Sequence, residues 1–239
     1  MIKAVLFDLG NTLVYSHPEE TFQEIMAKHG VVKSLEDVRA ALTQGNEEFD
    51  AERHEGLSVH AFYTQWNIVQ LKHLGLTGPK ARQLAESIDT LWWKFAKFYV
   101  FRDVKRTLQQ LRKMRLQLGI VTGGFEEDIE MIVPSTGLGE FFDVLVGANT
   151  TGKRKPHPGA FKHALMKLGV SAGETVFVGD NFNNDYLGAQ KVGLIPVLIR
   201  RKSSSAQRLF TDSCLQLPSE TRMIERLDQI FDVLRQLSP

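Results

Sequence analysis

Polar side chains stand directly after apolar runs at four widely separated places in this chain. Asp8 follows an apolar, β-branched run near the N-terminus, and Thr122 follows a second run of this kind. A third run precedes the loop that carries Lys155, and a fourth precedes Asp180 and Asp185. Such runs predict strands that are buried on both faces. Because the carboxyl ends of parallel strands share one sheet edge, we expect these side chains to meet around a single pocket.

The types of these residues favour chemistry on a phosphoryl group. Carboxylates at short range repel one another and require a cation, and oxygen ligands without a cysteine or histidine cluster favour Mg²⁺. Lys155 would neutralise both a carboxylate and a substrate phosphate. One carboxylate would attack phosphorus while the metal, lysine, hydroxyl and backbone amides stabilise the developing charge. The structural alternative makes Thr122 a strand-end cap, Lys155 a solvated charge, and Asp180 and Asp185 turn formers.

Strands and helices alternate along most of the chain. The second to fourth of these apolar runs cover residues 116–121, 142–147 and 175–179, and a further run covers residues 195–199. Amphipathic helical patterns separate them, which predicts an α/β fold with a doubly wound parallel sheet. Strand character is predicted to end after Leu13, and Glu220 to Leu237 is predicted to form a final amphipathic helix.

An all-helical insertion of about four helices is predicted between the first strand and the rest of the sheet. Residues 1–15 and 100–239 would form the core domain, and residues 16–99 a helical cap domain. Ser16 and Ser34 are the expected caps of its first two helices. Side chains that could set substrate specificity in this cap are Glu19, Phe22, Gln23, Arg53 and Trp93.

Composition narrows the classes of function. The 239 residues carry 29 basic and 28 acidic side chains, a formal net charge of +1, so no large electrostatic footprint for nucleic acid is present. A single cysteine, Cys214, suits a reducing compartment, and no signal-peptide profile or apolar run of ~18 residues is found. We therefore expect a soluble, cytoplasmic protein without a membrane partner; its oligomeric state is not indicated.

Four motifs in order resemble the haloacid dehalogenase-like hydrolase superfamily. The first is the strand that ends in Asp8, with Thr12 at the family's threonine position, and the second is Thr122-Gly123-Gly124. The third extends from Gly152 through Lys155-Pro156-His157-Pro158 to Phe161, and the fourth from Val178-Gly179-Asp180 to Asp185. The helical insertion lies where the family places a helical cap of the first type. The resemblance covers almost the whole chain.

The resemblance implies a role for each site residue. Asp8 would be the nucleophile that forms an aspartyl-phosphate, and Mg²⁺ would be bound by Asp8, the Gly10 carbonyl and Asp180, with Asp185 orienting the metal's water shell or the lysine. The expected catalytic residues are Asp8, Thr122 and Lys155. Asn11, Thr122, Gly123 and Lys155 would contact the substrate, which we expect to be a small phosphorylated metabolite.

Three positions depart from the family pattern. Phosphatases of this family usually carry a second aspartate, the general acid–base, where this chain has Gly10. General acid–base catalysis contributes typically 10²–10⁴-fold. A cap residue such as His17 would supply the proton, or the substrate would have a good leaving group, or turnover would be slow. Gly123 also replaces the usual asparagine, and Asn11 the usual glycine.

Three rival functions therefore stay open. A haloacid dehalogenase also lacks the second aspartate, although it needs no metal and usually has a tyrosine where Gly10 stands. A phosphonate hydrolase tolerates a small residue there but needs a lysine from the cap, for which Lys28 and Lys33 are candidates. A protein that binds phosphate and metal without turnover is the third.

Overall fold

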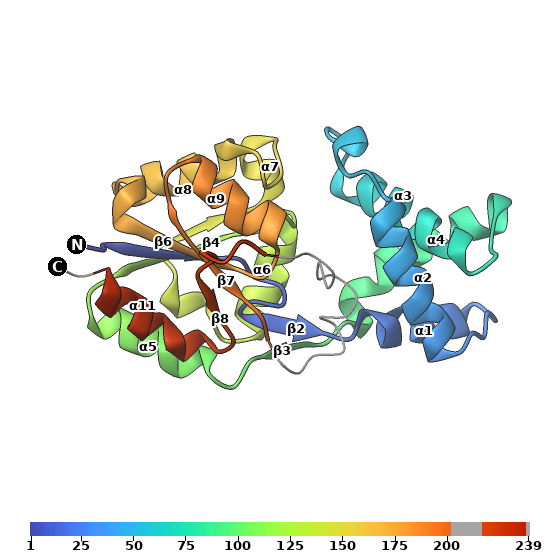
Figure 1. Cartoon of the computed structure of the whole chain (residues 1–239). Coiled ribbons are helices and arrows are strands. Elements are labelled where there is room, and N and C mark those ends of the chain that lie inside the picture. Colours follow the sequence, from blue (N-terminus) through green and yellow to red (C-terminus); the bar gives the residue numbers. More distant parts are fainter. Residues whose placement is uncertain (202–216, 238–239) are drawn as a thin grey trace. The chain divides into compact units, whose positions relative to one another are not determined.

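The computed structural model describes residues 1–201 and 217–237, which divide into two compact units. The core unit consists of Met1–Tyr15 and the described chain from Phe98 onward, and the helical unit consists of Ser16–Lys97. Both are visible in Figure 1.

The core unit contains a six-stranded sheet in the order β5-β4-β1-β6-β7-β8, and every pairing in it is parallel. Its strands are β1 (Ala4–Phe7), β4 (Gln117–Val121), β5 (Val144–Val146), β6 (Thr175–Gly179), β7 (Ile195–Ile199) and β8 (Met223–Ile224). Strand order reverses at the central β1, because β4 lies on one side of it and β6 on the other. The predicted α/β fold with a doubly wound parallel sheet is confirmed.

Close packing explains why the sequence places its most apolar strands in the centre of the sheet. All four residues of β1 are buried, as are all five of β6. Gly119 lets β4 lie close to its neighbours, since an added Cβ there would stand 2.7 Å from Leu6 and 2.4 Å from Val144. Phe161 packs edge-on against Phe177 with ring centroids 5.1 Å apart. The sheet is therefore a rigid base for the loops at its carboxyl edge.

Helices cover both faces of this sheet, and Figure 1 shows α8 and α9 on one face and α5 and α11 on the other. The α-helices in the described part of the core unit are α5 (Val104–Lys113), α6 (Glu126–Ser135), α7 (Ala148–Thr151), α8 (Pro158–Leu168), α9 (Gly188–Lys191) and α11 (Ile230–Gln236). Pro158 occupies the first turn of α8, where its missing N–H costs no helical hydrogen bond.

Two predictions about the core unit are wrong. Strand character does not end at Leu13, because β2 (Val14–Ser16) pairs with β3 (Phe98–Val100) in a separate two-stranded sheet. Only the second half of the expected helix from Glu220 to Leu237 is an α-helix, since Met223–Ile224 form β8. The Leu198 N–H donates to the Arg222 carbonyl at 2.9 Å and the Arg200 N–H to the Ile224 carbonyl at 2.8 Å. Sheet pairing here outweighs the helical periodicity. The run from Arg200 to Ser205 is predicted from its sequence to be a polar connection, and beyond Arg201 it lies outside the described residues.

The helical unit is built from four helices packed around their apolar faces. These are α1 (Pro18–Lys28), α2 (Leu35–Glu48), α3 (Val59–His73) and α4 (Gly78–Phe95). Ser34 caps α2 as predicted, accepting from the Asp37 N–H at 3.0 Å, whereas the N-cap of α1 is His17 rather than Ser16. Trp92 and Phe95 pack against the apolar core of this unit. None of the described helices combines the length and apolar character needed to cross a membrane.

Several of the proposed specificity residues make their contacts within the helical unit itself. Phe22 is part of the apolar core, and Glu19 is buried and paired with Arg39 at 3.1 Å. Gln23 donates to the Lys33 carbonyl at 2.8 Å. Lys28, a candidate phosphonatase lysine, lies 4.8 Å above the Phe95 ring. Arg53 pairs on the surface with Asp50 at 2.9 Å, and Trp93 is half-buried.

Candidate active site

Strand register brings the ends of three central strands to one place. Phe7, the last residue of β1, pairs with Val178 of β6 on one side and with Ile120 of β4 on the other. Asp8 comes next and donates its backbone N–H to the Val178 carbonyl at 2.8 Å. Thr122, directly after β4, and Asp180, directly after β6, therefore lie at the same carboxyl edge of the sheet as Asp8.

Lys155 joins two of the predicted acids. Its Nζ lies 2.6 Å from Oδ1 of Asp8 and 2.6 Å from Oδ1 of Asp185. Its side chain is 3% exposed, so the charge is held away from water. The ammonium group also stands 5.3 Å from the centroid of the Phe177 ring, which is part of the buried sheet. A lysine 147 positions after Asp8 in sequence thus becomes its direct partner.

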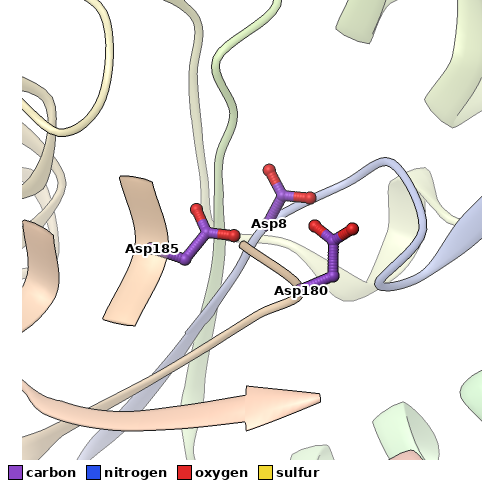
Figure 2. Close-up of side chains that lie close together, drawn as sticks. All are labelled: Asp8, Asp180 and Asp185. Carbon is purple, nitrogen blue, oxygen red and sulfur yellow. The ribbon is translucent and has the colours of Figure 1, made fainter. Parts of the chain in front are cut away.

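Three carboxylates gather around this lysine. One oxygen from each of Asp8, Asp180 and Asp185 lies within 4.8 Å of the other two. Figure 2 shows the three carboxyl groups beside one another, each contributed by a different part of the backbone. Asp8 and Asp185 are buried and Asp180 is half-buried. The predicted convergence of strand ends therefore produces a cluster of three acids and one base.

The charges of this cluster shift its pKa values away from their ordinary range. Burial raises the pKa of Asp8 to about 6; Lys155 opposes this shift and Asp185 adds to it. Burial and the neighbouring Asp8 and Asp185 raise the pKa of Asp180 well above its usual range. Burial would lower the pKa of Lys155, but its ion pairs with Asp185 and Asp8 outweigh burial and raise it. The ammonium is therefore charged at neutral pH, while two acids resist ionisation.

This donor set suits a hard divalent cation. Three carboxylates face one ammonium group, so the ionised cluster carries an excess of negative charge that a cation would offset. Oxygen donors within this spacing fit Mg²⁺ or Ca²⁺ better than metals that prefer sulfur or nitrogen. Burial is the main cause of the raised pKa of Asp180, and repulsion from Asp8 and Asp185, which Lys155 only partly offsets, adds to it.

The position of the Asp185 side chain depends on Gly179 and on a π-helical turn. It lies on a π-helical turn, Phe182–Leu187, and its Oδ2 accepts from the Asn181 N–H at 3.0 Å. A Cβ added to Gly179 would stand 2.3 Å from that same Oδ2. The last residue of β6 must therefore lack a side chain for Asp185 to reach Lys155. π-helical turns are often found at functional sites.

The loop after β4 carries the predicted phosphate contacts. Oγ1 of Thr122 accepts from the Gly124 N–H at 3.2 Å, which folds the loop back on itself. Arg154 donates to the Gly123 carbonyl and lies 4.3 Å above the Phe125 ring. Sequence reasoning missed Arg154, although the basic run from Lys153 to Lys155 could have drawn attention to it.

The loop after Asp8 holds the two unusual residues. Gly10 is exposed, and a Cβ added there would meet no heavy atom within 4 Å. Asn11 has φ of 53°, a left-handed conformation that asparagine tolerates better than most residues. Asn11 can thus replace the family's usual glycine, and Gly10 leaves open space where a side chain would stand.

The sequence matches one family over most of its length. The haloacid dehalogenase-like hydrolase family covers residues 2–193. The chain belongs to this family. Its predicted membership and its class, a phosphatase-type hydrolase, are confirmed by this match and by relatives that are named phosphatases.

Two such relatives are instructive for this haloacid dehalogenase-like hydrolase. It is 30% identical to the glyceraldehyde 3-phosphate phosphatase of Methanopyrus kandleri, over 100% of this chain and 99% of the relative. It is 28% identical to a phosphoglycolate phosphatase of Pseudomonas savastanoi, over 82% of this chain and 69% of the relative.

Solved structures share the fold. The magnesium-bound putative HAD-hydrolase YfnB of Bacillus subtilis matches with a TM-score of 0.75 and 18% identity over 98% of each chain. The L-2-haloacid dehalogenase of Xanthobacter autotrophicus matches with a TM-score of 0.74 and 19% identity over 100% of each chain. Phosphatases and dehalogenases thus share this architecture, so the chemistry must be argued from the site.

Proposed function

We propose that this protein is a Mg²⁺-dependent phosphatase of a small phosphorylated metabolite, and that it acts through an aspartyl-phosphate on Asp8. The helical unit, Ser16–Lys97, would serve as the cap. The observation that carries the proposal is the buried bridge of Lys155 between Asp8 and Asp185, at 2.6 Å to each, beside the third acid Asp180.

Asp8 is suited to act as the nucleophile. Lys155 binds its Oδ1, which leaves the other carboxylate oxygen for attack on phosphorus. A bond forms between this oxygen and phosphorus while the bond from phosphorus to the leaving oxygen breaks. The Thr122 hydroxyl, the Gly123 N–H and the Lys155 ammonium would stabilise the charge on the remaining phosphoryl oxygens.

A second displacement regenerates the enzyme. Water attacks phosphorus of the aspartyl-phosphate, the bond to Asp8 breaks, and inorganic phosphate leaves together with the proton lost from water. Lys155 then pairs again with the free carboxylate of Asp8. Closure of the cap would exclude bulk water during the first displacement.

Asp8 and Asp180, with the Gly10 carbonyl, would hold the cation, and Asp185 would orient its water ligands or Lys155. A bound Mg²⁺ would neutralise the carboxylates and the phosphoryl group, so that the anionic nucleophile can approach an anionic substrate. Without it, repulsion from Asp180 and Asp185 would oppose substrate binding.

The named relatives and the glycine at position 10 together limit the classes of substrate that we expect. The two named relatives act on glyceraldehyde 3-phosphate and phosphoglycolate, which are small phosphate monoesters. Gly10 offers no side chain to protonate an alkoxide leaving group, and this protonation is typically worth 10²–10⁴-fold. Acyl and aryl phosphates, whose leaving groups depart without a proton, would therefore be turned over faster than alkyl phosphates, unless a cap residue supplies the proton.

A metabolite screen tests this function. The protein would be incubated with glyceraldehyde 3-phosphate, phosphoglycolate, an acyl phosphate and an aryl phosphate, with Mg²⁺ or with EDTA, and phosphate release measured. The Asp8→Asn variant is the control, since it keeps the shape of the side chain and loses the nucleophile. We expect Mg²⁺-dependent release by the native protein and a loss of about 10³-fold or more in the variant. Acid quenching should trap phosphate on the peptide that contains Asp8.

The rival functions give different outcomes in the same experiment. Equal and negligible turnover by both proteins, with phosphate and metal still bound, would identify a binding protein. Halide release from a 2-haloacid without metal would identify a dehalogenase. Cleavage of a phosphonate that depends on Lys28 or Lys33 would identify a phosphonate hydrolase.

A further inference from the structure

Arg201 joins segments of the core unit that are far apart in sequence. It lies just after β7, and its guanidinium donates to both carboxylate oxygens of Asp103, at 2.7 and 2.6 Å. It also donates to the backbone carbonyl of Thr12 at 2.6 Å and lies 4.1 Å above the Phe101 ring. The side chain is 5% exposed. Such a buried, charge-assisted network holds its members in one geometry.

The Thr12 carbonyl belongs to the loop that follows the nucleophile, residues 9–13. Thr12 is fully buried, so its carbonyl would be costly to leave without a donor, and Arg201 supplies one. The same loop contains Gly10 and the left-handed Asn11. Its far end is closed by the Leu13 and Val14 N–H groups, which both donate to the Leu9 carbonyl, at 3.0 and 3.1 Å.

Asp103 anchors the other side of the network. Its Oδ2 accepts from the Leu227 N–H at 2.6 Å in addition to Arg201. Its backbone carbonyl accepts from the Thr107 side chain at 2.7 Å, at the start of α5. The neighbouring Phe101 N–H donates to the Leu13 carbonyl at 3.2 Å. Arg201 therefore connects the nucleophile loop to two anchored segments.

We propose that Arg201 is a positioning residue for the active site: by holding the Thr12 carbonyl against Asp103, it fixes the loop that carries Asp8 and the Gly10 carbonyl. This inference rests on the proposed function, in which both groups bind Mg²⁺. Arg201 itself touches neither metal nor substrate. Nη1 of Arg201 contacts both oxygens of Asp103 while Nη2 reaches the Thr12 carbonyl, and the single ammonium of a lysine cannot supply two separate donor nitrogens.

The experiment compares Arg201→Gln with a matched variant, Arg226→Gln. Arg226 also pairs with an aspartate, Asp228, but both side chains are exposed, and such pairs contribute little. Three quantities are measured: the Mg²⁺ dissociation constant by calorimetry, hydrogen exchange of the Leu13 and Val14 amides, and kcat and KM on the best substrate of the screen.

We expect Arg201→Gln to weaken Mg²⁺ binding and to lower kcat, each by about 10-fold or more, with KM changed less, because the loop is no longer held. Exchange at Leu13 and Val14 should become faster, and Arg226→Gln should match the native protein throughout. Unchanged Mg²⁺ affinity and kcat, accompanied only by a lower melting temperature, would overturn the proposal and leave Arg201 a structural residue.

A more conservative substitution of Arg201 provides a second test in case the Arg201→Gln variant does not fold. Arg201→Lys keeps the charge but has only one donor nitrogen, and we expect an intermediate loss of Mg²⁺ affinity; native affinity in this variant would also overturn the proposal. Calorimetry and hydrogen exchange need no turnover. If the native protein releases no phosphate, the proposed function fails, while these two measurements still decide the role of Arg201.

Discussion

Two buried ionic clusters in the core unit differ in their balance of charge. Arg201 and Asp103 form one pair with opposite charges, and Asp103 uses both carboxylate oxygens to bind the guanidinium. Around Lys155, three acids share a single base. The charges of the first cluster balance, whereas those of the second would balance only with a further cation. Charge imbalance, rather than burial, therefore distinguishes the candidate catalytic cluster from the structural one.

Among changes that leave the nucleophile Asp8 in place, removing the base of the unbalanced cluster should have the largest effect. Lys155→Met leaves three neighbouring carboxylates without an ammonium group, and it also removes a donor to the phosphoryl oxygens. We expect phosphate release to fall by about 10²–10³-fold. A steady-state assay measures the loss. Lys3→Met, which removes the surface pair with Glu174, is the control and should keep full activity.

The balanced cluster should respond in the opposite way to loss of an acid. Asp103→Asn leaves Arg201 without a buried counter-charge, and we expect about 3 kcal/mol of destabilisation. Asp8→Asn relieves the excess of acids and keeps an oxygen for Lys155, so in EDTA its stability should equal or exceed that of the native protein. Urea unfolding in EDTA measures both. Equal destabilisation of the two variants would remove the distinction between the clusters.

A fourth acid can be added to the unbalanced cluster by the Gly10→Asp substitution. The open space around Gly10 accommodates the side chain, and the new carboxyl group could protonate a leaving alkoxide. We expect turnover of alkyl phosphates to rise about 10-fold, and that of aryl phosphates to change little, because their leaving groups need no proton. Comparing the two substrate classes in one assay checks this. An equal change for both would show that proton donation does not limit the native enzyme.

The smallest expected effect is a change in metal-induced stabilisation with pH. Asp8 has a pKa of about 6 in the folded chain against an ordinary value of 3.8, so its ionisation disfavours the metal-free fold as pH rises from about 4 to 6. Bound Mg²⁺ favours the ionised form and reverses this loss. The melting temperature in Mg²⁺ minus that in EDTA should therefore grow across pH 6, on the order of 1 kcal/mol or about 2–4 °C. A constant difference from pH 5 to 8 would contradict the assignment.

The unbalanced cluster could be predicted from the sequence, and the balanced one could not. Asp8, Thr122 and Asp180 each follow a buried strand directly, so the topology of a parallel sheet is enough to bring them to one edge. Arg201 lies 98 positions from Asp103 and inside a polar run, and no periodicity marks the partner of such a residue.

Short strands were the other limit of prediction. Strand β2 has three residues and pairs with an equally short strand more than 80 positions later. Its stability comes from tertiary contacts, such as the stacking of Tyr15 on Tyr99 at 5.3 Å, rather than from a local pattern. Strand β8 has only two residues, and the helical periodicity around it concealed the pairing with β7.

Gly179 has a consequence for how this site can vary. The atoms of this residue perform no step of the proposed reaction, yet a methyl group there would coincide with the carboxylate of Asp185. Alanine, the mildest replacement, would have to push that acid away from the ammonium group it binds. A position without chemistry of its own is thus as intolerant of change as the acids beside it, because it provides room that no other residue can.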